Sequence, residues 1–279
     1  MSQVFDLRRV EIVRGPQGIL FGRNTTAGAF SFYSHKPDDF FNGYGQVTYG
    51  SFGQLDAEGA INVPLGDNVA TRVSGLVRSS DGWATNVHTG TKAYAFDSVA
   101  LRGQIGFDIG ASRWVANIHY SDFDGNSNFY FQEGFGLEYD QLSQNNSELP
   151  EEIKAFGGNL IGNFFIGNVD VTSISAYEST DYFGVEEFSY GAGSIQNPGR
   201  FVQFNPYAAG YRDDYYQLSQ EIRLSGSSGG LEWIAGVFGY YENVDSEFSD
   251  GGYQTGTIGL DFNDNGVIDP PGEGWFPED

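Results

Sequence analysis

Residues 55–78 read LDAEGAINVPLGDNVATRVSGLVR, and the spacing within this stretch decides the fold. Apolar or small residues take every second position over 55–63 and again over 69–77, with more polar residues between them. A period of two is typical of β-strands whose two faces meet different surroundings. Residues 64–68, Pro-Leu-Gly-Asp-Asn, have the composition of a turn. The stretch therefore predicts two antiparallel strands joined as a hairpin.

The same alternation recurs along the rest of the chain, whereas helical periodicity is nearly absent. Nine strands are expected, at 44–50, 55–63, 69–77, 99–107, 114–121, two within 162–178, 218–224 and from 231 to 237. Clusters of Gly, Asn, Asp and Ser separate them, which is typical of an antiparallel meander rather than of βαβ units. The sequence therefore predicts an all-β fold.

The connections between these strands alternate in length. Short turns are expected at 64–68, 108–113, 167–168 and 225–230, and long connections at about 79–97, 122–158, 179–214 and 242–279. Short turns on one rim and long loops on the other are the layout of a bacterial outer-membrane barrel, whose strands need only about 10 alternating residues each. No apolar run reaches the length of a transmembrane helix. We therefore expect an antiparallel transmembrane β-barrel, incomplete because such barrels have even strand numbers.

The composition excludes several classes of protein. The chain carries 37 Asp and Glu against 14 Lys and Arg, a formal net charge of −23, so we expect no nucleic-acid partner. The absence of cysteine excludes disulfides, thiol catalysis and cysteine-ligated metal centres. Aromatic residues make up 16% of the chain, which argues against a disordered acidic tail.

A second informative stretch lies near the N-terminus. Residues 9–25 read RVEIVRGPQGILFGRNT, and residues 27–37 read AGAFSFYSHKP. Pro16 fixes its own φ, and Gly15 and Gly18 admit backbone angles closed to other residues, so a tight corner follows the first strand. Both stretches closely resemble the end of the plug domain of TonB-dependent outer-membrane receptors, in which a Val-Glu-Val strand runs into Arg-Gly-Pro and a later strand ends in Lys-Pro.

The resemblance covers most of the chain. It continues at 44–53, which looks like the first barrel strand of the family, at the turn 62–67, and at 216–237. The chain departs from the family pattern at Ala27, where a second glycine is common, and at 30–32, where Phe-Ser-Phe replaces Ile-Asn-Ile. Both changes keep the apolar, small, apolar rhythm of the strand.

The resemblance implies a domain organisation and a function. Residues 1–40 would be the C-terminal part of the plug domain and residues 41–279 the N-terminal portion of a barrel of about 22 strands, so the chain would be an interior fragment. The implied function is TonB-energised uptake of a scarce ligand, such as a ferric siderophore, haem, cobalamin or an oligosaccharide, at the bacterial outer membrane. The implied partners are the TonB complex through a missing N-terminal segment, the outer-membrane lipid and a small-molecule or metal-chelate ligand.

The resemblance also assigns roles to individual residues. The plug motif falls on Glu11, Arg14, Gly15, Pro16, Gly18 and Gly22. Plug arginines of this family pair with glutamates on the barrel wall, so we expect such a partner for Arg14 and take Glu221 as a candidate. The alternatives for Arg14 are an exposed head group or a carboxylate within the plug.

Aromatic residues in the long connection at 122–158 are candidates for ligand contact. Receptors of this family commonly use aromatic loop residues in that role, and Phe129, Tyr130 and Phe131 form such a group. The alternative is that these side chains anchor the loop or lie at the membrane border.

The segment 261–269 has the spacing of a calcium loop. The candidate ligands are Asp261, Asn263, Asn265, the backbone carbonyl of Val267, Asp269 and, one place late, Glu273. Oxygen donors at this spacing suit a hard cation, but the bidentate carboxylate expected at the twelfth position is Gly272. The sequence leaves two interpretations, calcium binding in an extracellular loop and an Asx-rich solvated turn, and no cofactor is required.

No catalytic motif is found, so we expect no enzymatic activity. The histidines are far apart, and adjacent carboxylates on a strand point to opposite faces, which disfavours a polysaccharide-acting enzyme. The main alternative function is that of a secreted soluble β-protein that binds calcium or glycans. That protein would have to bury Leu55, Ile61, Val73, Leu101, Ile118 and Trp233 in a dry core.

Overall fold

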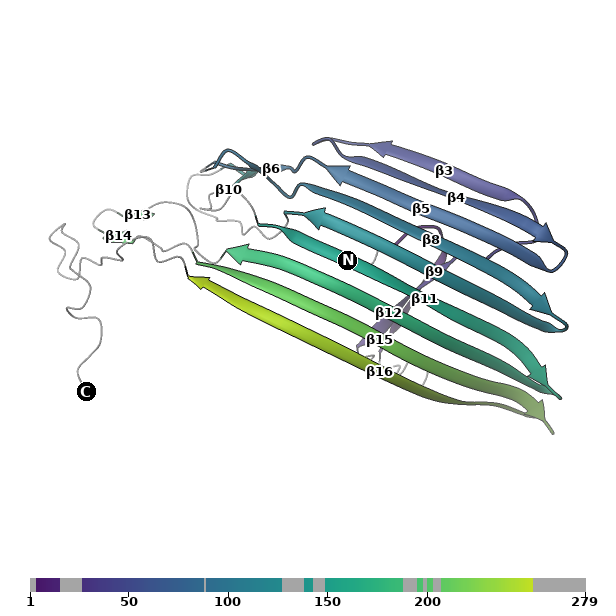
Figure 1. Cartoon of the computed structure of the whole chain (residues 1–279). Helices are drawn as coiled ribbons and strands as arrows, with labels where there is room; N and C mark the ends of the chain where they lie inside the picture. The colour runs from purple at the N-terminus through teal and green to yellow at the C-terminus, as the bar shows by residue number, and fades with distance from the viewer. Residues whose placement is uncertain are drawn as a thin grey trace, which may run out of the picture.

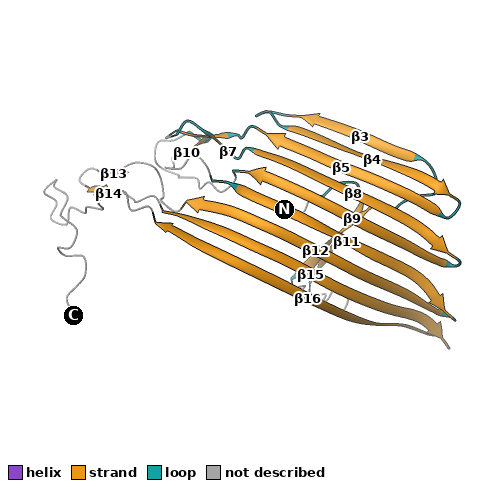
Figure 2. Ribbon diagram, in the orientation of Figure 1, coloured by secondary structure: helices purple, strands orange, loops and turns teal. Residues whose placement is uncertain are grey.

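The computed structural model describes residues 4–15, 27–87, 89–126, 138–142, 149–187, 195–197, 200–202 and 207–252. All regular secondary structure in these ranges is β, as Figure 2 shows. Nine strands form one large sheet: β3 (Asn42–Tyr49), β4 (Leu55–Gly66), β5 (Val69–Ser80), β8 (Phe96–Ile109), β9 (Ser112–Gly125), β11 (Glu151–Ile166), β12 (Val169–Glu187), β15 (Tyr207–Ser228) and β16 (Leu231–Gly252).

The large sheet is an antiparallel meander. Within this sheet each interior strand pairs with the sheet strands that precede and follow it along the chain, from β3 at one edge to β16 at the other (Figure 1). The edges β3 and β16 do not pair with each other, so the barrel is not closed. Because neighbours in sequence are neighbours in space, each hairpin could be predicted from local alternation alone. The all-β, antiparallel and incomplete barrel expected from the sequence is confirmed.

Three smaller sheets accompany the large one. The N-terminal hairpin consists of β1 (Leu7–Arg14) and β2 (Gly28–Ser34). A three-stranded sheet contains β6 (Ala84–Asn86), β7 (Lys92–Ala93) and β10 (Gln141–Leu142), and β13 (Ile195–Asn197) pairs with β14 (Arg200–Val202). The last two sheets lie at the end of the large sheet that carries the long connections (Figure 1).

The large sheet has its apolar face on the outside. Exposed large apolar side chains share the outward face: Leu55, Ile61, Val73, Val77, Leu101, Ile105, Ile118, Tyr120, Phe156, Leu160, Leu218, Ile222 and Val237. The inward face carries small and polar residues, and those buried there include Ala60, Asn62, Ala70, Arg72, Ser74, Ala100 and Gln104. This inverted pattern suits a wall between lipid and a polar lumen.

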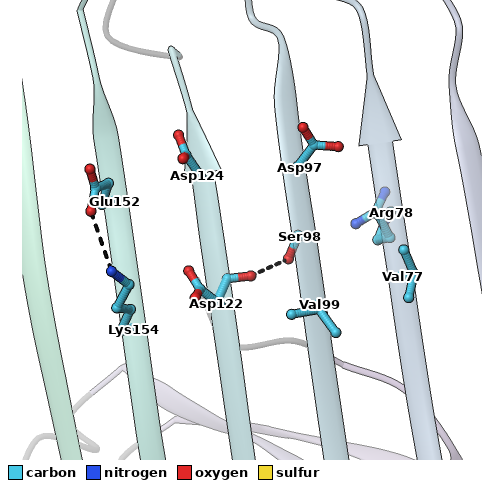
Figure 3. A pocket seen from close by; sticks show the side chains of 9 residues that line it. All are labelled: Val77, Arg78, Asp97, Ser98, Val99, Asp122, Asp124, Glu152 and Lys154. Atoms are coloured by element: carbon cyan, nitrogen blue, oxygen red, sulfur yellow. Dashed lines mark hydrogen bonds and ion pairs between the residues drawn. The ribbon is translucent and has the colours of Figure 1, made fainter.

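Charged side chains limit the apolar face toward the long connections. Asp97, Asp124 and Glu152 stand opposite one another on β8, β9 and β11 (Figure 3), and Lys154 Nζ lies 3.5 Å from Glu152 Oε2. Below them, Val99 to Ile109 of β8 run through the apolar face for about 34 Å of strand. At the usual strand tilt this spans roughly 25 Å, the height of a membrane-embedded band.

Several strands are longer than the sequence predicts. β12 continues to Glu187 and β15 begins at Tyr207, so the connection expected over 179–214 is mostly strand. β16 likewise continues to Gly252, eleven residues into the connection expected from 242. These extensions lie beyond the apolar band, where polar and aromatic residues are mixed on both faces, so backbone pairing persists without regular hydrophobic alternation. In the part of the chain described here, no helix is long and apolar enough to cross a membrane.

Candidate functional site

The N-terminal hairpin lies against the inward face of the large sheet. In Figure 1 its strands cross behind the sheet at the level of β9 to β15. The residues just before it contact inward side chains of β4, β5 and β8, and the residues just after it contact β4 and β9. The polar inward face and the hairpin together form the candidate functional site.

A buried ion pair joins the segment before β1 to the wall. Arg72 Nε donates to Asp6 Oδ2 at 2.8 Å, and Arg72 Nη2 donates to Asp6 Oδ1 at 2.5 Å. The Asp6 side chain is fully buried and that of Arg72 is 4% exposed. Arg72 Nη1 also donates to Asn42 Oδ1 at 3.1 Å. The planar guanidinium thus binds the carboxylate with two parallel hydrogen bonds, the strongest geometry available to such a pair.

Glu58 holds the backbone of the same segment. The backbone N–H of Asp6 donates to Glu58 Oε1 at 3.0 Å, and the Tyr44 hydroxyl donates to the same oxygen. Asp6 has φ +51°, a left-handed conformation that non-glycine residues seldom adopt. Because both its side chain and its N–H are bound, the wall fixes this bend in the chain.

Phe5 anchors the segment by packing. It is 4% exposed and packs with Leu76 and Ala100 of the wall. The Arg102 guanidinium lies 4.4 Å from the centre of the Phe5 ring, and its Nη1 donates to the Phe5 carbonyl at 3.2 Å. A cation over an aromatic ring is attractive, more so where water is excluded. Phe5 and Asp6 therefore form one attachment point.

The chain between β2 and β3 is fastened to the wall by the side chains of Asn62 and Arg113. Asn62 is fully buried, and its Nδ2 donates to the carbonyls of Asp38 at 2.8 Å and Phe40 at 2.7 Å. Its Oδ1 accepts from the Asp38 N–H at 2.9 Å. Arg113 Nη2 donates to the Pro37 carbonyl at 3.2 Å. The exit of the hairpin is therefore held on the wall by hydrogen bonds, as its entry is.

A cavity of about 500 Å³ separates the hairpin from the wall beside Phe5. Leu7 and Phe32 line its hairpin side, and Arg102, His119 and Glu178 are among the wall residues. His119 Nε2 and Glu178 Oε2 are 2.9 Å apart although β11 lies between their strands.

A glycine makes this contact possible. Gly157 stands between His119 and Glu178 in the same row of the sheet. A Cβ at Gly157 would lie 2.0 Å from Glu178 Oε2 and 2.7 Å from His119 Nε2. His119 and Glu178 therefore form a polar patch of the wall that faces the cavity, and the hydrogen bond between them crosses β11.

Aromatic side chains line the inward face toward the long connections. The rings of Phe96 and Phe123 stack with centroids 5.8 Å apart, and those of Tyr211 and Phe248 lie 5.1 Å apart. Phe96, Tyr211 and Phe248 belong to one row that crosses the sheet through Glu151. Flat aromatic faces beside carboxylates are a suitable contact surface for a compact ligand above the hairpin.

Parts of two long connections fold into a packed module. Ala84, Ala93, Leu142 and Leu149 are fully buried together, and the rings of Trp83 and Tyr94 stack 5.2 Å apart. Burial raises the pKa of the Tyr94 phenol. The sequence predicted only long connections over 79–97 and 122–158, and this is corrected by the three-stranded sheet, whose two- and three-residue strands are too short to show alternation.

Comparisons with known proteins agree with this architecture. The chain is 26% identical over 271 residues to the ferrioxamine B receptor of Salmonella typhimurium strain SL1344, a match that covers 92% of this chain and 34% of the relative. It is 36% identical over 81 residues to the ferrioxamine B receptor of strain LT2, covering 28% of this chain and 12% of that protein. No family model matches.

Solved structures give the same result for the fold. The ferric yersiniabactin uptake receptor FyuA from Yersinia pestis superimposes with a TM-score of 0.73 at 16% identity, over 88% of this chain and 38% of that one. The siderophore receptor PiuA from Acinetobacter baumannii gives 0.71 at 14% identity, over 89% and 38%. In sequence and in fold, the chain resembles the TonB-dependent outer-membrane receptors. This confirms the family resemblance and the outer-membrane localisation expected from the sequence. The chain spans about a third of the length of the first curated relative.

The structure describes only part of the plug motif, namely Glu11, Arg14 and Gly15. Gly15 has φ +83°, which is open to glycine and strained for other residues, as expected for the tight corner. Glu11 accepts from Arg9 Nε at 2.6 Å, and Arg14 stands opposite Gly28 at the end of the hairpin. Pro16, Gly18 and Gly22 lie outside the described residues.

Of the other predicted site residues, the structure describes Glu221 but not the loop residues. Glu221 faces inward on β15, and its Oε1 lies 2.8 Å from Arg223 Nε, so its pairing with Arg14 stays a prediction. The aromatic group 129–131 and the calcium-loop residues from 261 to 273 lie outside the described residues. Among the described residues, no three His, Asp or Glu side chains are arranged to hold a metal ion.

Sequence reasoning missed the residues that fasten the hairpin, namely Asp6, Asn62 and Arg72. The available signal was the position of Asn62 and Arg72 on the polar face of strongly alternating strands. That signal places both side chains in the lumen. It does not identify their partners, because Asp6 is separated from Arg72 by 66 positions of sequence.

Proposed function

We propose that this receptor takes up a ferric chelate across the outer membrane, with the N-terminal hairpin acting as part of the plug. The observation that carries the proposal is the placement of the hairpin on the polar inner face of a wall whose outer face is apolar. Residues 1–40 are then the end of the plug domain and residues 41–279 the start of the barrel. The wall is the fixed part, and the plug is the part that must move to open a path.

The names of the similar proteins favour a ferric siderophore over the other ligands considered. The curated relatives are ferrioxamine B receptors, and the solved structures include receptors of ferric yersiniabactin and of other siderophores. Haem, cobalamin and an oligosaccharide remain outcomes of the test below. We propose the TonB complex as the energy-supplying partner, and no bond chemistry is assigned to the chain.

The alternative of a soluble calcium- or glycan-binding protein is disfavoured by burial. It requires Leu55, Ile61, Val73, Leu101, Ile118 and Trp233 in a dry core. The first five are exposed on the outward face, and Trp233 is half-buried. Calcium binding over 261–273 and ligand contact by Phe129, Tyr130 and Phe131 stay proposals for the loops. Calcium titration of a chelator-treated sample tests the first.

Uptake measurements with labelled ligands test the function. The complete gene product is expressed in Gram-negative cells that lack their own siderophore receptors, and cells with and without TonB are compared. We expect iron from ferrioxamine B to enter only the cells with TonB. Parallel assays use a ferric catecholate, haem, cobalamin and a maltooligosaccharide. Uptake of one of the last three alone would replace the ferric chelate with that ligand, and no uptake of any would overturn the proposal.

A further inference from the structure

The ion pair between Asp6 and Arg72 differs from other ion pairs of the described residues. Arg9–Glu11, Arg78–Asp56, Arg113–Asp108 and Arg223–Glu221 each join residues of one hairpin or one sheet, with side chains 25% to 48% exposed. Asp6–Arg72 instead joins the segment before the N-terminal hairpin to the barrel wall, and it is almost completely buried. Ion pairs exposed to water contribute little to stability, whereas separating a buried pair leaves two uncompensated charges away from water.

The position of Asp6 along the chain matters as much as its burial. Phe5 and Asp6 precede β1, so tension applied from the N-terminal side reaches them before it reaches the hairpin. Phe5 also borders the cavity of about 500 Å³ between hairpin and wall. The segment therefore has space beside it into which water can enter as the pair separates, while the strands of the wall stay paired.

We propose that the Asp6–Arg72 pair is the catch that keeps the plug closed, and that it must open before the hairpin can leave the wall. The charges are reversed relative to the expected pairing of a plug arginine with a wall glutamate, because here the wall carries the arginine and the plug segment the carboxylate. Arg102 and Glu58 are positioning residues, because they hold the Phe5 carbonyl and the Asp6 N–H in place for the pair. Only the uptake assay of this proposal depends on the proposed function.

A reversible cross-link tests the catch. These 279 residues contain no cysteine. In the complete gene product, with any cysteine outside them replaced by serine, the double variant D6C/R72C can therefore be joined selectively with a short bis-thiosulfonate. We expect the cross-linked receptor to bind ferrioxamine B with the Kd of the wild type but to lose uptake, and a reductant to restore uptake. Undiminished uptake by the cross-linked receptor would overturn the proposal.

The matched control is D56C/R78C. Arg78 Nε and Asp56 Oδ1 are 3.2 Å apart and face inward, but both belong to directly paired strands of the wall. Cross-linking this pair ties together two strands that do not separate, so uptake should be unchanged. Equal loss of uptake in both cross-linked variants would attribute the effect to the reagent and contradict the catch.

A second readout does not depend on the identity of the ligand. Asp6→Asn keeps the size of the side chain but removes its charge, so we expect higher entry of a large antibiotic and faster protease cleavage before β1 than in Asp56→Asn. Equal behaviour of D6N and D56N would overturn the catch. If neither the variants nor the wild type bind any ferric chelate, the proposed function is wrong. Antibiotic entry and protease cleavage still test whether the Asp6–Arg72 pair keeps the plug closed.

Discussion

Asn62 shows how one buried amide can hold a connection. Its three hydrogen bonds go to the backbone of Asp38 and Phe40, and the residue is fully buried. Asn62→Ala would remove all three hydrogen bonds and leave the Phe40 carbonyl with only the bond from Asn42 Nδ2 at 3.3 Å, so we expect a loss of roughly 2 to 3 kcal/mol in the free energy of unfolding. Urea titration of the detergent-folded receptor measures this loss.

The control for that variant is Asn163→Ala, since Asn163 is exposed and accepts one hydrogen bond from Thr172 Oγ1. It should change the free energy of unfolding by less than about 0.5 kcal/mol. Equal losses in the two alanine variants would show that the Asn62 hydrogen bonds do not hold the connection.

Gly157 illustrates a glycine that is needed for space rather than for backbone freedom. Gly157→Ala should displace the flexible ends of His119 and Glu178 and break their hydrogen bond, at a cost of roughly 1 to 2 kcal/mol. Unfolding of the single variants and of G157A/E178A forms a double-mutant cycle. We expect G157A to cost less once Glu178 is replaced by alanine, because only the His119 ring then has to move and no hydrogen bond is left to break. Additive costs would contradict this mechanism, and Gly45→Ala, which has open space, is the control.

The strands were predictable because each one separates two different environments. Alternation over 99–107, for example, predicted a strand with Leu101 and Ile105 on one face, and both are exposed on the outward face of β8. The ends of β12, β15 and β16 were not predictable, because beyond the apolar band neither face excludes water. The partners of Arg72 and Asn62 were not predictable either, since alternation gives the face of a strand but no distance across the lumen.

The outward face of β8 supports a prediction about the membrane band. Ile105 lies near the middle of the apolar stretch, whereas Asp124 of β9 lies in the charged row at its border. We expect Ile105→Lys to lower the stability of the lipid-embedded receptor by roughly 2 to 4 kcal/mol and Asp124→Lys to change it by about 1 kcal/mol or less. Unfolding in lipid vesicles, followed by tryptophan fluorescence, measures both. Equal effects would mean that the membrane border does not lie at this row.

The molecule as a whole has a sheet with two free edges. β3 and β16 are each hydrogen-bonded on one side within the described residues, and β16 presents a 22-residue edge. In lipid every unpaired backbone N–H and C=O costs several kcal/mol, so an open sheet of this length is not viable there. The described strands therefore need further strands, or a second copy, to complete their hydrogen bonding.

We accordingly expect the 279-residue polypeptide, expressed by itself, to form no closed barrel in vesicles or detergent. The measurement is the shift in gel mobility between unheated and boiled samples, together with protease resistance of the band. Co-expression with the remaining strands of a matching receptor should restore both, because only then are the edges of β3 and β16 paired. A heat-modifiable, protease-resistant barrel from the 279 residues alone would show instead that the chain closes its own edges, with a sheet that differs from the open one seen here.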